Sequence, residues 1–135
     1  MRDAQWIFGA IDLATKETDV SSADVVKLGA INSKAPFSLH QTGRAQDGYE
    51  VVFCPAAALA SIDSFIPFIE DSDDNSTFAK ILTGPQTSAG LKAGTHIKLP
   101  LPMEHKQYIR VGCTPKSSGT FTATTVNAWV EAGPN

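Results

Sequence analysis

The side chains best suited to bind a metal or move a proton near neutral pH are three histidines: His40, His96 and His105. They are far apart in the sequence, and none has the short spacing to a second ligand that zinc sites use. His40 and His96 fall at polar positions of alternating segments, which is typical of solvated surface histidines. The sequence therefore predicts no metal and no cofactor. A cupin-type enzyme would require the fold to bring the histidines and a carboxylate together.

An acidic segment at residues 70–75, EDSDDN, carries oxygen ligands at the alternate spacing with which calcium loops begin. Ser76 stands where such a loop needs glycine for its sharp turn, and Leu82 stands where it needs a bidentate carboxylate. We therefore interpret this segment as a solvated turn between two strands.

The two cysteines, Cys54 and Cys113, each lie in an apolar run typical of a strand, VVFCPA and IRVGCT. We expect both to be buried and reduced, because no segment indicates secretion into an oxidising compartment. Neither cysteine nor any serine has a base that the sequence alone assigns, and no glycine-rich phosphate-binding loop is visible. The protein is not expected to be an enzyme.

Length and composition indicate one soluble globular domain. The chain has 135 residues, 42% of them apolar and 19% charged, which is enough for a core without disulfides. Its net charge is -3 and its eleven basic residues are scattered, so nucleic-acid binding is not expected. No apolar run is long enough to span a membrane, and we expect synthesis in a cytoplasm.

Residues 107–132 show most clearly how the fold is built. Alternation in the first run predicts a strand with one dry face, made of Ile109, Val111 and Cys113. Residues 114–119 are rich in the residue types that turns use, and residues 120–130 are rich in β-branched and aromatic types. We predict two strands joined as a long C-terminal hairpin.

Similar patterns predict further short strands at residues 25–28, 37–41, 49–54, 63–70, 77–83 and 95–102. Pro67 cannot donate to a ladder, so its strand should lie at a sheet edge or carry a bulge. Residues 56–62, AAALASI, favour helix but are too few for a stable one, so we expect one helical turn or a tight connection. About eight strands without a sustained helical period predict an all-β sandwich or barrel.

The N-terminal segment, residues 1–14, holds three large apolar side chains in a row: Trp6, Ile7 and Phe8. An isolated strand cannot turn all three toward one core. Either two of them pack on the sandwich and one lies at its rim, or the segment is an arm that docks on a partner. We take these three residues as candidate partner-binding residues, with Trp129 near the C-terminus as a further candidate.

Five segments together carry a resemblance to a known family. They are DVVKLG at residues 24–29, TFAKILTG at 77–84, KLPLP at 98–102, QYIRVGCT at 107–114 and GTFTATTVNAWV at 119–130. In this order the chain resembles the capsid cement proteins of tailed bacteriophages, the group like the Bordetella phage cement protein. The segment AAALASIDSF matches that pattern least well.

This resemblance implies a jelly-roll-like antiparallel β-sandwich, with residues 1–14 as an N-terminal arm or first strand and residues 15–135 as a single domain. It implies a structural protein of the virion, made in the bacterial host cytoplasm and placed on the outer surface of the capsid. The implied partners are the major capsid protein and the chain itself, as a homodimer or homotrimer at a local symmetry axis. It implies no catalysis, cofactor, nucleic acid or membrane.

The alternative from another functional class is a carbohydrate-binding or receptor-binding β-sandwich. Such a module would need exposed aromatic side chains that converge on a groove. The chain has only two tryptophans and two tyrosines, which is a small supply for this purpose.

Overall fold

The computed structural model describes residues 7–27, 49–102 and 104–132. Over these residues the chain forms nine strands and no helix, and so none that could cross a membrane. The strands are β1 (Ile7–Leu13), β2 (Val20–Ser21), β3 (Val26–Lys27), β4 (Tyr49–Pro55), β5 (Asp63–Ser72), β6 (Ala79–Thr83), β7 (Ile97–Pro100), β8 (Tyr108–Ser117) and β9 (Thr124–Ala132).

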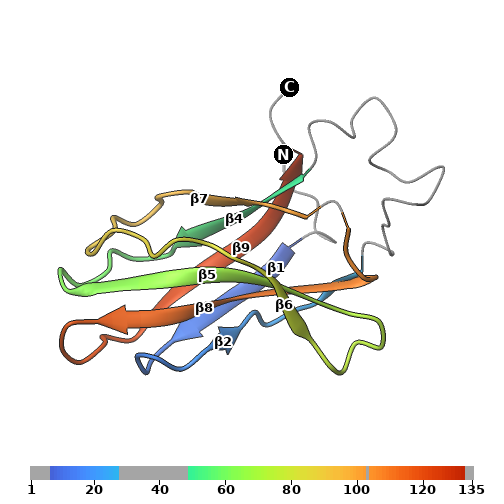
Figure 1. The fold of residues 1–135 in the computed structure, drawn as a ribbon. Helices are drawn as coiled ribbons and strands as arrows, with labels where there is room; N and C mark the ends of the chain where they lie inside the picture. Colours follow the sequence, from blue (N-terminus) through green and yellow to red (C-terminus); the bar gives the residue numbers. More distant parts are fainter. Residues whose placement is uncertain (1–6, 28–48, 103, 133–135) are drawn as a thin grey trace.

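The strands form two antiparallel sheets that pack as a sandwich (Figure 1). The four-stranded sheet has the order β1-β9-β4-β7, and the five-stranded sheet has the order β2-β8-β5-β6 with β3 also paired to β8. When β2 and β3 are counted as one interrupted edge strand, this is the strand order of a jelly roll. The predicted all-β, jelly-roll-like antiparallel sandwich is thus confirmed.

The core lies between the two sheets and is built by alternation along each strand. Ile109, Val111 and Cys113 of β8 are fully buried, which confirms the predicted dry face. β9 contributes Val126, Ala128 and Val130 from the opposite sheet, and the largest core side chains are the phenylalanines, Phe8, Phe53, Phe65 and Phe121. This close packing makes the sandwich rigid. Because the inner faces of both sheets form the core, contacts with other molecules can be made only by the outer faces, the edges and the loops.

The predicted C-terminal hairpin is wrong. β8 belongs to the five-stranded sheet and β9 to the four-stranded sheet, so the chain between them crosses from one sheet to the other. β8 also continues through Pro115 to Ser117. The carbonyl of Pro115 accepts a hydrogen bond from Glu17 N–H at 2.8 Å. The backbone polar groups of Pro115 therefore point away from β5, and the absence of an N–H on Pro115 costs no hydrogen bond between β8 and β5.

The expected edge position of the strand with Pro67 is also wrong, since β5 lies between β8 and β6. The carbonyl of Pro67 accepts a hydrogen bond from Gly84 N–H at 2.8 Å, and Gly84 follows Thr83, the last residue of β6. The backbone edge of Pro67 that lacks an N–H therefore faces Gly84, beyond the end of β6, where no strand residue needs that hydrogen bond. A bulge does occur in the β5–β6 pairing, between Ile69 and Glu70.

Residues 56–62 form a tight connection of bends and a turn, one of the two alternatives expected, rather than a helical turn. Leu59 N–H donates to Leu91 C=O at 2.8 Å, which ties this connection to the loop before β7. The predicted strand at residues 25–28 corresponds to β3, Val26–Lys27, which begins one residue later than predicted, and Leu28 lies outside the described residues. The predicted strand at residues 37–41 lies outside the described residues.

Candidate partner-binding surface

The residues proposed from the sequence for partner contacts lie on two neighbouring strands. β1 runs antiparallel to β9, and Ile7 stands opposite Trp129 in this pairing. Trp129 alternates with the residues of β9 that belong to the core cluster, so it and Ile7 lie on the outer face of the four-stranded sheet. Ile7 is 37% exposed there. The structure thus brings two of the four candidates together.

Phe8 is a core residue and not a contact residue, which corrects the hypothesis made from the sequence. Its side chain is fully buried between the sheets. A bulge between Ile7 and Gly9, whose φ is +85°, allows Phe8 and Ile11 both to face inward although they are three positions apart. Trp6 lies outside the described residues.

The far edge of β1 is covered by the chain that leads from β2 to β3. Asp24 N–H donates to Phe8 C=O at 2.9 Å, and Ala23 N–H donates to Ala10 C=O at 3.0 Å. Residues 7–13 are therefore held on both sides, by β9 and by these two hydrogen bonds. This part of the N-terminal segment belongs to the sandwich.

Trp129 lies on an outer face yet is only 5% exposed. Its indole Nε1 donates to Glu131 Oε1 at 2.9 Å, and the ring of His96 meets it edge-on with the ring centroids 5.4 Å apart. Val52, opposite Trp129 on β4, is fully buried on the same face. Trp129 offers a partner little surface of its own, so among the described residues Ile7 is the exposed large apolar side chain at this place.

The outer face of the five-stranded sheet has a different character, because charged side chains cover it and pair with one another. Lys80 Nζ lies 4.4 Å from the ring centroid of Phe68 and 2.8 Å from Asp19 Oδ2. Thr114 Oγ1 donates to Asp19 Oδ1 at 2.6 Å. The bond from Lys80, and then that from Thr114, lowers the pKa of the Asp19 carboxyl below its usual value.

A second pair on this face is more deeply buried. Arg110 Nε donates to Glu70 Oε1 at 3.0 Å, and Ser21 Oγ donates to the same oxygen at 3.3 Å. The side chain of Glu70 is 11% exposed and that of Arg110 is 28% exposed. The guanidinium carbon of Arg110 also lies 4.0 Å from the ring centroid of Phe78. These contacts join strands β2, β8 and β5 and the residue that precedes β6 across the face.

The predicted solvated turn at residues 70–75 is wrong for its first three residues, because Glu70, Asp71 and Ser72 belong to β5 and are buried. The bends at residues 73–77 that follow are held by one carboxylate. Asp74 Oδ1 accepts hydrogen bonds from Ser72 Oγ, Ser76 N–H and Thr77 N–H, between 2.8 and 3.0 Å. The bond from Thr77 is the main cause that lowers the pKa of Asp74 to about 2. Asp71 Oδ2 accepts from Lys106 N–H at 2.9 Å. The described residues contain no group of three His, Cys, Asp or Glu side chains placed to hold a metal.

The histidines and cysteines, which could bind a metal or act as nucleophiles, lie in separate parts of the fold. His96 is exposed, whereas His105 is buried with Nδ1 2.8 Å from the carbonyl oxygen of Lys106; His40 lies outside the described residues. Cys113 is buried on the inner face of β8 and Cys54 is half-buried on β4, in the other sheet, and both are free thiols. Burial raises the pKa of the Cys113 thiol well above its ordinary value.

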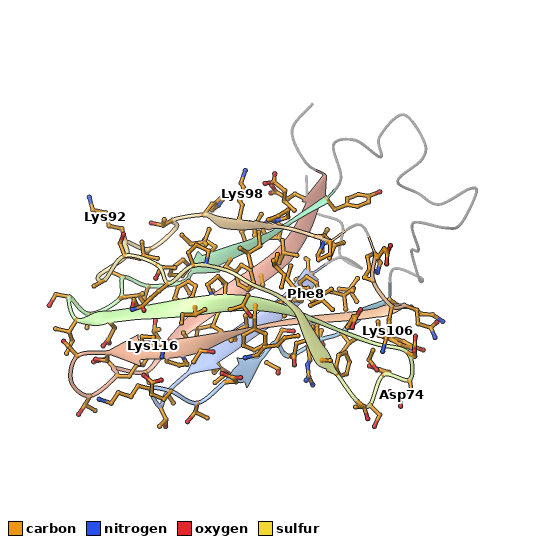
Figure 2. All side chains as sticks on the ribbon, in the orientation of Figure 1. Phe8, Asp74, Lys92, Lys98, Lys106 and Lys116 are labelled. Atoms are coloured by element: carbon orange, nitrogen blue, oxygen red, sulfur yellow. The ribbon has the colours of Figure 1, made fainter. Side chains whose placement is uncertain are left out.

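One feature of the surface was not predicted from the sequence. A pocket of about 470 Å³ lies at the end of the sandwich where β8 ends and β5 begins, with Lys116 and Glu17 among its lining residues. Figure 2 shows Lys116 at the opposite end of the sandwich from Asp74. The lining residues come from strand ends and loops far apart in the sequence, so no local spacing indicates this pocket.

Comparison with known protein families places the chain in a described family. A family model described as Bbp16 matches residues 11–130, from within β1 to within β9. The matched region takes in all the strands between these two and therefore both sheets of the sandwich. None of the curated proteins matches the chain.

Proposed function

The chain belongs to the Bbp16 family, and from this membership we propose that it is a capsid cement protein of a tailed bacteriophage. It binds the outer surface of the assembled head and clamps neighbouring major capsid proteins. The observation that carries the proposal is the family match across both sheets, because the family name suggests a Bordetella phage protein. The five sequence segments that resemble phage cement proteins support the same function.

The architecture suits a protein that acts by binding alone. A ligand that binds an assembled state and not its free components stabilises the assembly by mass action. Clamping also requires a unit that resists deformation, and a sandwich with a close-packed core between two sheets meets this requirement. A homodimer or homotrimer at a local symmetry axis would allow one unit to hold two or more capsid subunits.

The two outer faces of the sandwich differ in their suitability for the capsid contact. Docking on the five-stranded sheet would desolvate the paired side chains of Arg110 and Glu70 and of Lys80 and Asp19, which costs free energy. The four-stranded sheet instead presents exposed Ile7 next to Trp129. Burial of such exposed apolar surface favours association. We therefore assign Ile7 to the contact with the major capsid protein.

The function is tested by sedimentation of the purified protein, alone and mixed with assembled heads or with unassembled capsid subunits. The expected result is co-sedimentation with heads and not with free subunits. The protein alone gives the oligomeric state in the same experiment. Equal binding to both forms, or to neither, would contradict the cement function.

The contact surface is tested with Ile7→Asp and a matched control, Ile62→Asp. Among the described residues, Ile7 and Ile62 are the large apolar side chains that are exposed, at 37% and 44%. Ile7→Asp should bind heads at least about tenfold more weakly, as loss of an interface anchor does, and Ile62→Asp should bind normally. Normal binding by Ile7→Asp would reject this contact while the sedimentation result for the unchanged protein still decides the function.

Point variants are preferable here to removal of the N-terminal segment. Deletion of residues 1–8 would remove Phe8, a fully buried core side chain. Truncation of a buried phenylalanine to alanine alone costs about 3–5 kcal/mol of stability. Loss of head binding after such a deletion would therefore report on folding as well as on contact.

A further inference from the structure

The pocket beside Lys116 has the composition of a binding site for a polar ligand. Its volume of about 470 Å³ lies within the range of about 300–1,000 Å³ that small-molecule sites occupy. It is walled by the ends of β5 and β8 and by the loops β1–β2, β4–β5, β6–β7 and β8–β9. Ligand-contacting residues are commonly found on loops that a rigid scaffold holds in place.

The polar groups of the pocket are both donors and acceptors. Gln86 Nε2 donates to Ser64 Oγ at 2.9 Å, which orients the amide and leaves its carbonyl oxygen and second N–H for other partners. Ser117 Oγ accepts from Gly119 N–H at 3.2 Å and retains its own O–H as a donor. Groups of mixed polarity match a ligand whose hydroxyls both donate and accept.

The charges of the pocket neutralise each other. Lys116 and Glu17 are its charged lining residues, and Lys116 Nζ lies 2.6 Å from Glu17 Oε2. Glu17 is held in place by its N–H, which donates to Pro115 C=O at 2.8 Å, although its φ of +66° is unfavourable for a residue with a side chain. An anionic ligand would approach the Glu17 carboxylate as closely as the ammonium group, so the pair disfavours it.

We propose that this pocket binds a neutral saccharide, as a single sugar or as the terminal sugar of a glycan. The hydroxyls of a sugar can pair with Gln86, Ser64 and the remaining N–H groups of Lys116. Among the described residues, the lining of this pocket contains no aromatic side chain, so Ile62, 44% exposed on the pocket wall, takes the place of an aromatic ring as the apolar contact for the C–H face of the sugar. This activity goes beyond capsid cementing and uses a different part of the molecule from Ile7.

The proposal is tested by titrating the full-length ¹⁵N-labelled protein with glucose, galactose, mannose and N-acetylglucosamine, and separately with inorganic phosphate and sulfate. At least one neutral sugar should shift the amide resonances of Ser64, Gln86 and Ser117, and the two anions should not. The proposal is overturned if no sugar shifts these resonances, or if the anions shift them and the sugars do not.

Substitutions test whether the sugar binds in the pocket beside Lys116. Gln86→Ala should weaken sugar binding about tenfold, the usual effect of one lost hydrogen bond at the upper end of its range. Gln107→Ala is the matched control, because Gln107 also donates one hydrogen bond, to the carbonyl of Asp73 at the other end of the sandwich. Equal sugar affinity in Gln86→Ala and Gln107→Ala would place the binding elsewhere. Head sedimentation should be unaffected by either variant, so the two functions are tested separately.

Discussion

The ring of Phe68 lies against Gly112 on the outer face of the five-stranded sheet, and no side chain fits between them. A β carbon at Gly112 would stand 2.4 Å from Cζ of Phe68 and 2.4 Å from the carbonyl oxygen of Val20. Lys80 Nζ also lies 4.4 Å from the centroid of the Phe68 ring, and Phe68 is 1% exposed although it lies outside the core cluster. Glycine at position 112 thus allows the Phe68 ring to pack directly against the backbone of β8 on the outer face of the sheet.

The first prediction concerns this contact. Gly112→Ala should lower the free energy of unfolding by about 1–3 kcal/mol, because the added methyl group overpacks a site bounded by backbone as well as by a ring. Urea unfolding measures the effect. Gly119→Ala is the control, since its β carbon would meet only the tip of the Ile62 side chain, at 3.1 Å. A loss in Gly112→Ala no larger than in Gly119→Ala would contradict the packing described.

The second prediction concerns the ion pair of Arg110 and Glu70. Arg110→Met should destabilise the protein by about 1–3 kcal/mol, because it leaves a mostly buried carboxylate with its charge uncompensated. Lys106→Met removes an exposed pair with Asp73 at 3.7 Å and should cost less than about 1 kcal/mol. In the double variant Arg110→Met/Glu70→Gln, part of the loss should be recovered. Equal effects of the two single variants would argue against a special role for the buried pair.

The third prediction concerns pH. The pKa of Asp74 is lowered from 3.8 to about 2 by the hydrogen bonds that its carboxylate accepts from the turn. A lowered pKa in the folded state means that the ionised carboxylate adds stability above pH 3.8, and that this stability is lost as the pH falls to about 2. The Tm of the wild-type protein should therefore exceed that of Asp74→Ala at pH 6, and the difference should shrink toward pH 2. A difference that stays constant over this range would be evidence against the assigned cause.

The fourth prediction concerns the thiols. Cys113 is fully buried and burial raises its pKa, so it should not react with a disulfide reagent in the folded protein. Cys54 is half-buried and should react slowly. One thiol should therefore be titrated under native conditions and two in denaturant, and Cys54→Ser should leave none reactive in the folded state. Native reaction of two thiols in the wild-type protein would show that β8 opens readily.

The sequence predicted the faces of strands better than their partners. Alternation identified the buried side of β8 because one face of that strand meets the core and the other does not. The hairpin prediction failed because a loop that crosses between two sheets uses the same residue types as a hairpin turn. Phe8 was misassigned because the bulge before Gly9 changes the alternation along β1, and such a bulge has no unique sequence signal.

The candidate sites depend on contacts that no local spacing reveals. Glu70 and Arg110 are 40 positions apart, and Glu17 and Lys116 are 99 positions apart. These pairs form only because the sheet order places β5 beside β8 and the β1–β2 loop beside the end of β8. The sequence indicated that Ile7 and Trp129 were unusual, but their adjacency required knowledge of the strand pairing.

The pairing of β1 with β9 sets the time at which this protein can fold during its synthesis. β9 lies between β1 and β4, so neither of these strands has its β9 partner until β9 has left the ribosome. Until then the nascent chain exposes Phe8, Val51 and Phe53, which are fully buried in the finished protein. A chain whose sheet depends on pairing between strands far apart in the sequence folds more slowly, and depends on chaperones more, than a chain built from local contacts. Production of this protein in large amounts therefore places a demand on the chaperones of the cell that makes it.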